Sequence, residues 1–124
     1  MKITIPFKTP TINHLYYHRG NIKILKTEAR ELQKKINDIV QGFSINHGVN
    51  LFSPGQPLKV VVEIYEDWYF KNGEVKKADV SNREKFLIDS VFKALQIDDK
   101  YIFENTFKKV QSQEEKAIIT IEAF

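Results

Sequence analysis

Cysteine is absent from the 124 residues of the sequence, which excludes disulfides, thiolate metal sites and cysteine nucleophiles together. A chain without cysteine is compatible with a reducing compartment. Apolar runs long enough for a signal peptide or a membrane span are also lacking, so we expect a cytoplasmic protein without membrane contact. The five glycines form no phosphate-binding loop, dinucleotide-binding turn or nucleophile elbow, so we expect neither an organic cofactor nor serine hydrolase chemistry.

Histidine is scarce as well, and the three that are present lie in predicted loops or connections: His14, His18 and His47. Because Zn²⁺ normally takes four protein ligands, or three together with water, we do not expect a zinc site. The hydrophobic fraction of 42% and the charged fraction of 28% are close to globular averages. A chain of this length can bury one core without a structural metal, so we expect a single domain over residues 1–124.

Acidic residues are missing before Glu28, whereas basic residues are not: this stretch contains Lys2, Lys8, Arg19, Lys23 and Lys26. A second basic cluster immediately precedes Asp79 and consists of Lys71, Lys76 and Lys77. The net charge of +3 is too small to indicate a nucleic-acid partner by itself. The uneven distribution places positive charge beside a carboxylate that is a candidate for catalysis, although lysines that simply solvate loops are the alternative.

Two helices are predicted from apolar residues that recur at helical spacing. The first covers residues 27–42, with Thr27 as a candidate N-cap and Gly42 at its end. The second covers about residues 82–95. The other elements are strands and hairpins, in the order β, α, β, hairpin, α, β, β. We therefore predict an α/β (α+β) domain in which two helices cover a mixed β-sheet.

Strands are expected at four places in the chain: residues 3–6, 58–65, 101–110 and 117–123. The last two are predicted to form an antiparallel pair that is joined by a polar turn. Asn72-Gly73 is the strongest short-range hairpin signal and predicts a basic hairpin within residues 67–77. Gly20-Asn21 indicates a smaller hairpin or turn near the N-terminus.

Carboxylates flank the second predicted helix, because Asp79 precedes it and the pair Asp98-Asp99 follows it. Mg²⁺ prefers oxygen ligands and is often held by one or two carboxylates together with phosphate oxygens. A helix of some thirteen residues is about 20 Å long, so only the tertiary fold can bring Asp79 and Asp99 together. An ordinary turn is the alternative role for Asp98-Asp99.

In their order and spacing these residues resemble the RusA-type Holliday junction resolvases. That family has a D-x-D-N motif that opens a helix, a lysine three residues after the Asn, an Asp four residues later, and an Asp-Asp pair before a strand. The corresponding residues are Asp79-Val80-Ser81-Asn82, Lys85, Asp89 and Asp98-Asp99. The resemblance covers nearly the whole chain, since it extends to residues 3–6, 13–17 and 57–63.

The resemblance implies a RusA-like fold and a homodimer that binds branched DNA, in particular a four-way junction. It also implies paired Mg²⁺-dependent incisions in recombination and repair, with Mn²⁺ as a substitute ion. Asp79 matches the first catalytic aspartate of the family, Asp99 matches the last, and Lys85 matches the active-site lysine. Asp98 and Ser81 complete the implied metal site. Without the resemblance, Lys85 would be interpreted as an exposed partner of Asp89 one helical turn away.

Ser81 departs from the family motif, which has an aspartate at this position. A serine hydroxyl can bind Mg²⁺ weakly or hold a metal-bound water, but it does not offset the charge of the ion. Ser81 and Glu84 also form the pattern of a capping box, which gives Ser81 a structural role at the start of the helix. The departure leaves a second hypothesis open: a weak or inactive protein that binds junctions and blocks or marks them. A dimeric interaction module is a more distant third.

The candidates for DNA contact lie in the predicted loops and hairpins. Aromatic and basic side chains at residues 16–19 are suited to stack on unpaired bases and to contact phosphates where a junction opens. Core packing is the alternative role for the two tyrosines in that segment. The complete set is Asn13, Tyr16, Tyr17, His18, Arg19, Lys23, Lys71, Lys76, Lys77 and Asn82.

Overall fold

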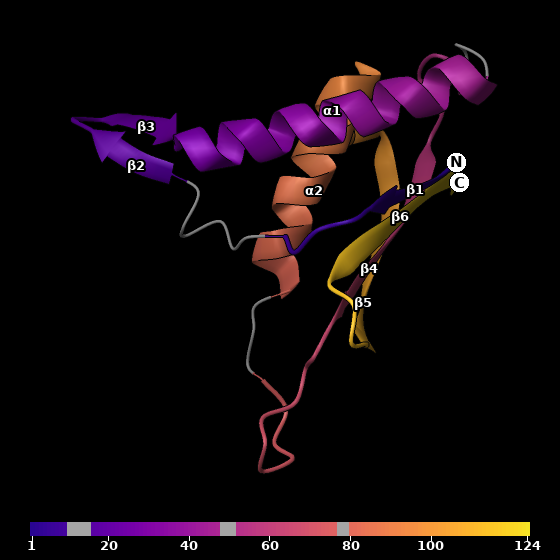
Figure 1. Cartoon of the computed structure of the whole chain (residues 1–124). Coiled ribbons are helices and arrows are strands. Elements are labelled where there is room, and N and C mark those ends of the chain that lie inside the picture. The colour runs from indigo at the N-terminus through magenta and orange to yellow at the C-terminus, as the bar shows by residue number, and fades with distance from the viewer. Residues whose placement is uncertain (10–15, 48–51, 77–79) are drawn as a thin grey trace.

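A four-stranded mixed sheet with both long helices on one face forms the frame of the molecule (Figure 1). The structure is a computed structural model that describes residues 1–9, 16–47, 52–76 and 80–124. The sheet order is β1-β6-β4-β5, with strands Lys2–Ile5, Lys116–Ala123, Leu58–Glu66 and Ile102–Gln111. The mixed sheet with two helices that the sequence predicted is therefore confirmed.

Strand β4 lies in the interior of the sheet, between β6 and β5, and alternate side chains along its whole length are buried. These side chains pack against the helices and include Leu58, Val60, Val62 and Ile64. Strand β6 pairs with one edge of β4 in antiparallel orientation, and β5 pairs with the other edge in parallel orientation. Helix α2 (Val80–Leu95) supplies the crossover that a parallel pair requires.

The predicted antiparallel pair of the last two strands is wrong, because β4 lies between β5 and β6. The hydrophobic pattern explains the outcome. Strand β5 is exposed along most of its length and suits an edge, whereas β4 has an apolar residue at nearly every inward position and gains from neighbours on both sides. Ser112, in the short connection, donates its backbone N–H to the carbonyl of Glu66 at the end of β4 (3.0 Å).

Helix α1 (Thr27–His47) follows a small hairpin formed by β2 (Tyr16–Arg19) and β3 (Ile22–Leu25). The hairpin prediction is confirmed, and Gly20 takes the positive φ of 64° that its two-residue turn requires. The predicted end of the helix at Gly42 is wrong, because Gly42 keeps a negative φ and the helix continues for five residues. Phe43, packed against the core, favours this continuation. Thr27 is inside the helix instead of capping it.

Helix α2 ends in a Schellman motif that directs the chain into β5. The backbone N–H of Gln96 donates to the carbonyl of Lys93 (3.2 Å), and that of Ile97 donates to Phe92 (3.1 Å). Gln96 has the left-handed conformation of such a motif (φ 58°), which glycine usually provides. A short 3-10 helix, η2 (Asp99–Tyr101), follows directly. The aspartate pair therefore lies in the tight connection between α2 and β5.

The segment after β4 forms a hairpin that extends beyond the sheet (Figure 1). Phe70 donates its N–H to the carbonyl of Glu74 (2.8 Å), and Gly73 donates to Phe70 (2.9 Å). The loop thus contains three residues and ends with Gly73 at a φ of 88°, which is a common hairpin geometry. The hairpin predicted from Asn72-Gly73 is confirmed, with one more loop residue than the two-residue form.

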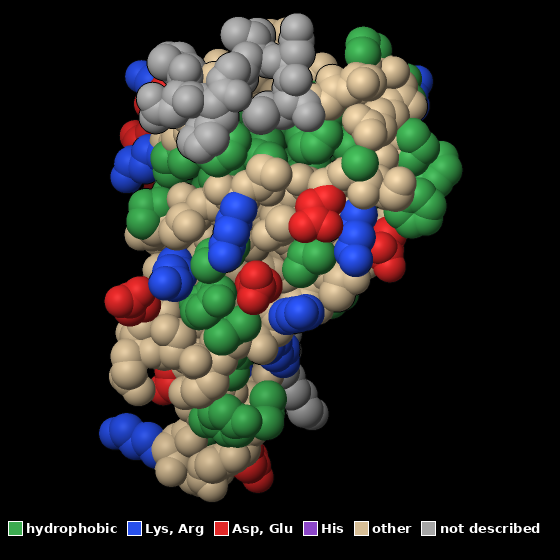
Figure 2. Space-filling model, turned by 90° about the vertical axis from the view of Figure 1, so that its right-hand side faces the viewer, with side chains coloured by type: hydrophobic (Ala, Val, Ile, Leu, Met, Phe, Trp, Pro, Cys, Tyr) green, Lys and Arg blue, Asp and Glu red, His purple; other side chains and the backbone are tan. Residues whose placement is uncertain are grey.

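The side of the molecule that the strands occupy has charges of both signs, interspersed with hydrophobic side chains (Figure 2). Three exposed ion pairs belong to these strands and their connections: Lys59–Glu104, Lys116–Glu114 and Lys8–Glu115. Among the described residues, no helix is long and apolar enough to cross a membrane.

Candidate active site

A cavity of about 560 Å³ lies where α2 passes over the first half of β5. The connection through η2 turns the chain back, so that β5 runs beside α2 and places its early residues near the polar side of the helix. The lining combines carboxylates, one amide, one lysine and two isoleucines: Glu84, Lys85, Ile88, Asp89, Asp99, Ile102 and Asn105. The fold thus brings Lys85 and Asp99, two residues predicted for the site, to the same cavity.

Glu84 and Asn105 line this cavity and were not predicted as part of the site. Glu84 is buried, and its carboxylate accepts a hydrogen bond from the side-chain amide of Asn105 on β5. The predicted capping box is wrong, because α2 begins at Val80 and Ser81 is already inside its first turn. One signal was available in the sequence, since Glu84 follows Ser81 by three residues and therefore shares its side of the helix.

The two residues of the aspartate pair have different surroundings. Asp98 caps η2, and its carboxylate accepts the backbone N–H of Lys100 at 2.9 Å. Asp98 also lines a neighbouring cavity of about 320 Å³, whereas Asp99 lines the cavity with Lys85. The turn role considered for the pair therefore applies to Asp98. The carboxylate of Asp99 remains available to a ligand.

Asp89 is the partly buried carboxylate in the middle of the cavity wall. Burial raises its pKa above the ordinary value of 3.8, the charge of Lys85 lowers it, and the charge of Asp99 raises it. Lys85 is exposed and, among the described residues, forms no ion pair within 4.0 Å. Its ammonium group therefore remains free to contact a phosphate.

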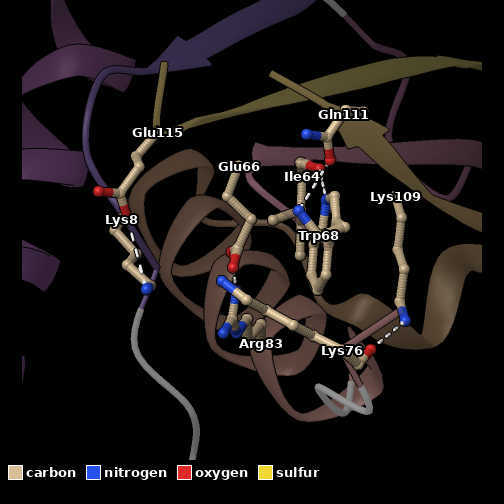
Figure 3. Close-up of polar contacts among 9 residues, drawn as sticks. All are labelled: Lys8, Ile64, Glu66, Trp68, Lys76, Arg83, Lys109, Gln111 and Glu115. Atoms are coloured by element: carbon tan, nitrogen blue, oxygen red, sulfur yellow. Dashed lines mark hydrogen bonds and ion pairs between the residues drawn. The ribbon is translucent and has the colours of Figure 1, made fainter. Parts of the chain in front are cut away.

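A cluster of polar and aromatic side chains at the base of the hairpin connects β4, β5 and α2 (Figure 3). Arg83 of α2 forms an ion pair with Glu66 of β4, and both side chains are buried. The guanidinium of Arg83 lies 5.3 Å from the ring centre of Trp68, and the Lys109 ammonium lies 4.9 Å from it. Lys109 also donates to the carbonyl of Lys76 (3.2 Å). These contacts fix the backbone at Lys76 and the first turns of α2 at Arg83.

Several predicted site residues lie outside the described part of the chain: Asn13, Lys77 and Asp79. For others the structure describes the backbone and not the side chain: Tyr16, Tyr17, His18, Lys23, Ser81 and Asn82. Of the remaining candidates, Arg19 and Lys71 are exposed, and Lys76 is half-buried with its ammonium 5.9 Å from the Phe70 ring centre. The β2–β3 hairpin and the hairpin around Gly73 project from different parts of the molecule (Figure 1).

The sequence matches the protein family described as Endodeoxyribonuclease RusA over residues 6–122. The chain belongs to this family. A comparison with the curated proteins found no match. RusA proteins are endodeoxyribonucleases that resolve Holliday junctions and generally depend on a divalent metal ion. The predicted family membership is therefore confirmed, and it supports a nuclease activity that acts on branched DNA.

The RusA motif can now be placed on the fold. Its lysine and its last aspartate, Lys85 and Asp99, line one cavity, while its variant position, Ser81, lies one turn before Glu84. Among the described residues, no group of three or more His, Cys, Asp or Glu side chains could hold a metal ion together. Mg²⁺ needs only one or two carboxylates with water and phosphate oxygens, so the oxygen donors of this cavity fit it.

Asp89→Asn should raise the free energy of unfolding at pH 7 in metal-free buffer. Because the folded state raises the pKa of Asp89, the ionised carboxylate costs stability above that raised value. The cost declines as the pH falls through the raised pKa and is absent below the unfolded value of about 3.8. Urea unfolding at pH 7 and pH 4 tests this. The gain should shrink at pH 4, and Asp38→Asn, at an exposed position on α1, is the matched control substitution.

Proposed function

We propose that this protein is a Mg²⁺-dependent, structure-selective endodeoxyribonuclease that resolves four-way junctions or other branched DNA. The observation that supports this proposal is the cavity that contains both Lys85 and Asp99, in a chain that matches the RusA family along nearly its whole length. A lysine and carboxylates around one open cavity suit phosphodiester hydrolysis, in which negative charge develops on a phosphate.

Asp99 and Asp79 are the residues that would hold the metal ion, with the Ser81 hydroxyl as a weak additional ligand. We assign Asp98 to the cap of η2, because its carboxylate is used there. Bound Mg²⁺ would neutralise phosphate charge and lower the pKa of a water molecule, which becomes the nucleophile. Mn²⁺ would substitute because it accepts the same oxygen ligands.

The protein itself supplies charge stabilisation and position. Lys85 is exposed at the cavity and would contact the phosphate that is cleaved or the oxygen that leaves. Asn105 donates a hydrogen bond to the carboxylate of Glu84 and thereby fixes the position of this carboxylate on the cavity wall. Paired incisions need two such sites, so we propose that the active form is a homodimer.

Cleavage of a synthetic four-way junction tests the proposal. A labelled junction should be cut at paired positions in the presence of Mg²⁺ and should remain intact in excess EDTA. A linear duplex of the same sequence is the matched control and should not be cut. Binding of the junction without cleavage at any Mg²⁺ concentration would instead support the second hypothesis, a protein that binds and blocks junctions, which the departure at Ser81 motivates.

Ser81→Asp should strengthen metal binding and lower the Mg²⁺ concentration needed for half-maximal cleavage. The change restores a carboxylate at the family position, in the first turn of α2 where negative charge is favourable. The free energy of unfolding should therefore change by less than about 1 kcal/mol. Mn²⁺ titration calorimetry and the Mg²⁺ dependence of cleavage are the two measurements.

Ser81→Asn is the matched control, because asparagine has the size of aspartate without its charge. This variant should leave the metal affinity close to that of the natural protein. If Ser81→Asp folds normally yet gains neither metal affinity nor cleavage, the account of a weakened metal site is wrong.

A further inference from the structure

A second cavity, with basic walls, lies between α1 and α2 and has a volume of about 230 Å³. Helix α1 lines it with four polar residues at positions 30, 33, 34 and 37, which share one face of a helix. Helix α2 contributes residues 90, 93 and 94. We call it the basic groove. Its lining includes three cations and no acidic residue: Arg30, Lys34 and Lys93.

The two helices are in contact at the basic groove. The side-chain amide of Gln41 on α1 donates to the carbonyl of Ala94 on α2 at 2.9 Å. Ala94 is buried and small, which lets the two helices approach closely at this point. The three cations line one cavity from two helices that pack against each other. Among the described residues, none of the three forms an ion pair.

Ser90 provides the second indication of a ligand. Its side chain is only 2% exposed and lines the basic groove, yet its hydroxyl has no hydrogen-bond partner among the described residues. A serine inside a helix usually donates to the carbonyl four residues earlier, and a buried hydroxyl without a partner costs free energy. A hydroxyl donor beside three cations is suited to an anion with several acceptor oxygens, such as a phosphate.

We propose that the basic groove binds a backbone phosphate of the DNA at a distance from the cleaved bond; this inference rests on the proposed function. Lys85, in the cavity proposed for catalysis, and Lys93 lie eight residues apart on α2, which is about 12 Å along the helix axis. That distance matches the rise of about three to four base pairs. The groove thus contacts the same DNA arm as the active site.

The lining favours a phosphate in DNA over a free nucleotide. No aromatic side chain is among the described residues that line the groove, so a nucleobase would find no ring to stack on. The open polar walls suit a backbone that runs across α1 and α2 and is recognised by charge alone. Contacts of this kind position the protein on DNA without selecting its sequence.

Lys34→Ala and Lys35→Ala provide a matched pair for the test, because both residues are exposed on α1 and only Lys34 lines the groove. Junction affinity is measured by fluorescence anisotropy over a series of salt concentrations. Lys34→Ala should bind about threefold to tenfold more weakly and reduce the slope of log K against log salt by about 0.9. Lys35→Ala should retain the natural slope. Equal slopes for the two variants would overturn the inference.

Junctions with one neutral methylphosphonate linkage locate the contact. A linkage about three to four nucleotides from the cleaved bond should weaken binding by the natural protein and have no further effect on Lys34→Ala. The comparison is between the natural protein and Lys34→Ala. If no single linkage weakens junction binding by the first more than by the second, the groove does not bind a backbone phosphate. A second outcome concerns inorganic phosphate. If it shifts the amide resonance of Ser90 in an NMR spectrum while the salt slopes of the natural protein and both variants stay equal, the groove binds a free anion and the DNA assignment is overturned.

The proposed function is tested separately by junction cleavage with the same natural protein. Junction cleavage by the natural protein together with equal salt slopes for Lys34→Ala and Lys35→Ala would reject only the assignment of the basic groove to DNA. Absence of both junction binding and cleavage would reject the proposed function, and the assignment of the groove to DNA with it.

Discussion

Asp99→Asn should reduce the rate of junction cleavage by at least about a hundredfold while the junction remains bound. The substitution keeps the size of the side chain and removes the carboxylate that lines the cavity with Lys85. Loss of a negative charge near phosphate should leave junction affinity unchanged or slightly higher. Single-turnover cleavage and a gel-shift assay in Ca²⁺ measure the two effects. We expect the same result for Asp79→Asn.

Asp98→Asn is the control for this experiment, because it makes the same change in charge at the adjacent residue. Asn caps a helix about as well as Asp, so the variant should fold normally and keep most of its cleavage activity. Normal cleavage by Asp99→Asn would reject the proposed metal site. Equal loss in both variants would show that the pair acts together and that our assignment of Asp98 to the cap is incomplete.

Arg83→Met should lower the free energy of unfolding by about 3–5 kcal/mol, because it leaves the buried carboxylate of Glu66 without its partner. The loss of the contact with Trp68 adds to this cost. Trp68 is the only tryptophan in the sequence, so its fluorescence reports the unfolding of this cluster in urea. The double variant Glu66→Gln/Arg83→Met should be less destabilised than Arg83→Met alone, since no buried charge remains unpaired.

An exposed ion pair between β4 and β5 serves as the comparison. Lys59 and Glu104 lie 3.5 Å apart, and both side chains are about half exposed, so Lys59→Met should cost less than about 1 kcal/mol. If Arg83→Met costs no more than Lys59→Met, the buried pair does not stabilise the fold as proposed. The result also bears on function, because Arg83 anchors the chain that follows Asp79.

Local patterns in the sequence predicted the elements well wherever the decisive interactions are short in range. The turn at Gly20 and the hairpin loop at Gly73 follow from backbone preference, and strand β4 follows from a run of β-branched residues. The end of α1 was mispredicted because a glycine stops a helix only when it takes a positive φ. Gly42 does not, and Phe43 is packed against the core.

Part of the candidate site was predictable from a sequence motif and not from local structural patterns. The order of the acidic motif and its lysine indicated the RusA family, and the family match over residues 6–122 confirms that membership. The roles of neighbouring residues depended on contacts that spacing does not contain. Glu84 was interpreted as part of a helix cap, whereas it contacts Asn105, which lies 21 residues later in the chain.

By itself, the sequence determined the approximate positions of the two long helices, the buried character of β4, the family of the chain, and the replacement of an aspartate by Ser81. These features depend on residue identity and on periodicity over one or two turns. The tertiary structure alone decided that β4 separates β5 from β6, that Asp98 and Asp99 line different cavities, and that Ser90 lies beside three cations from two helices. Each of these depends on which distant segments pack together, and many pairings satisfy the same local pattern until the whole core is assembled.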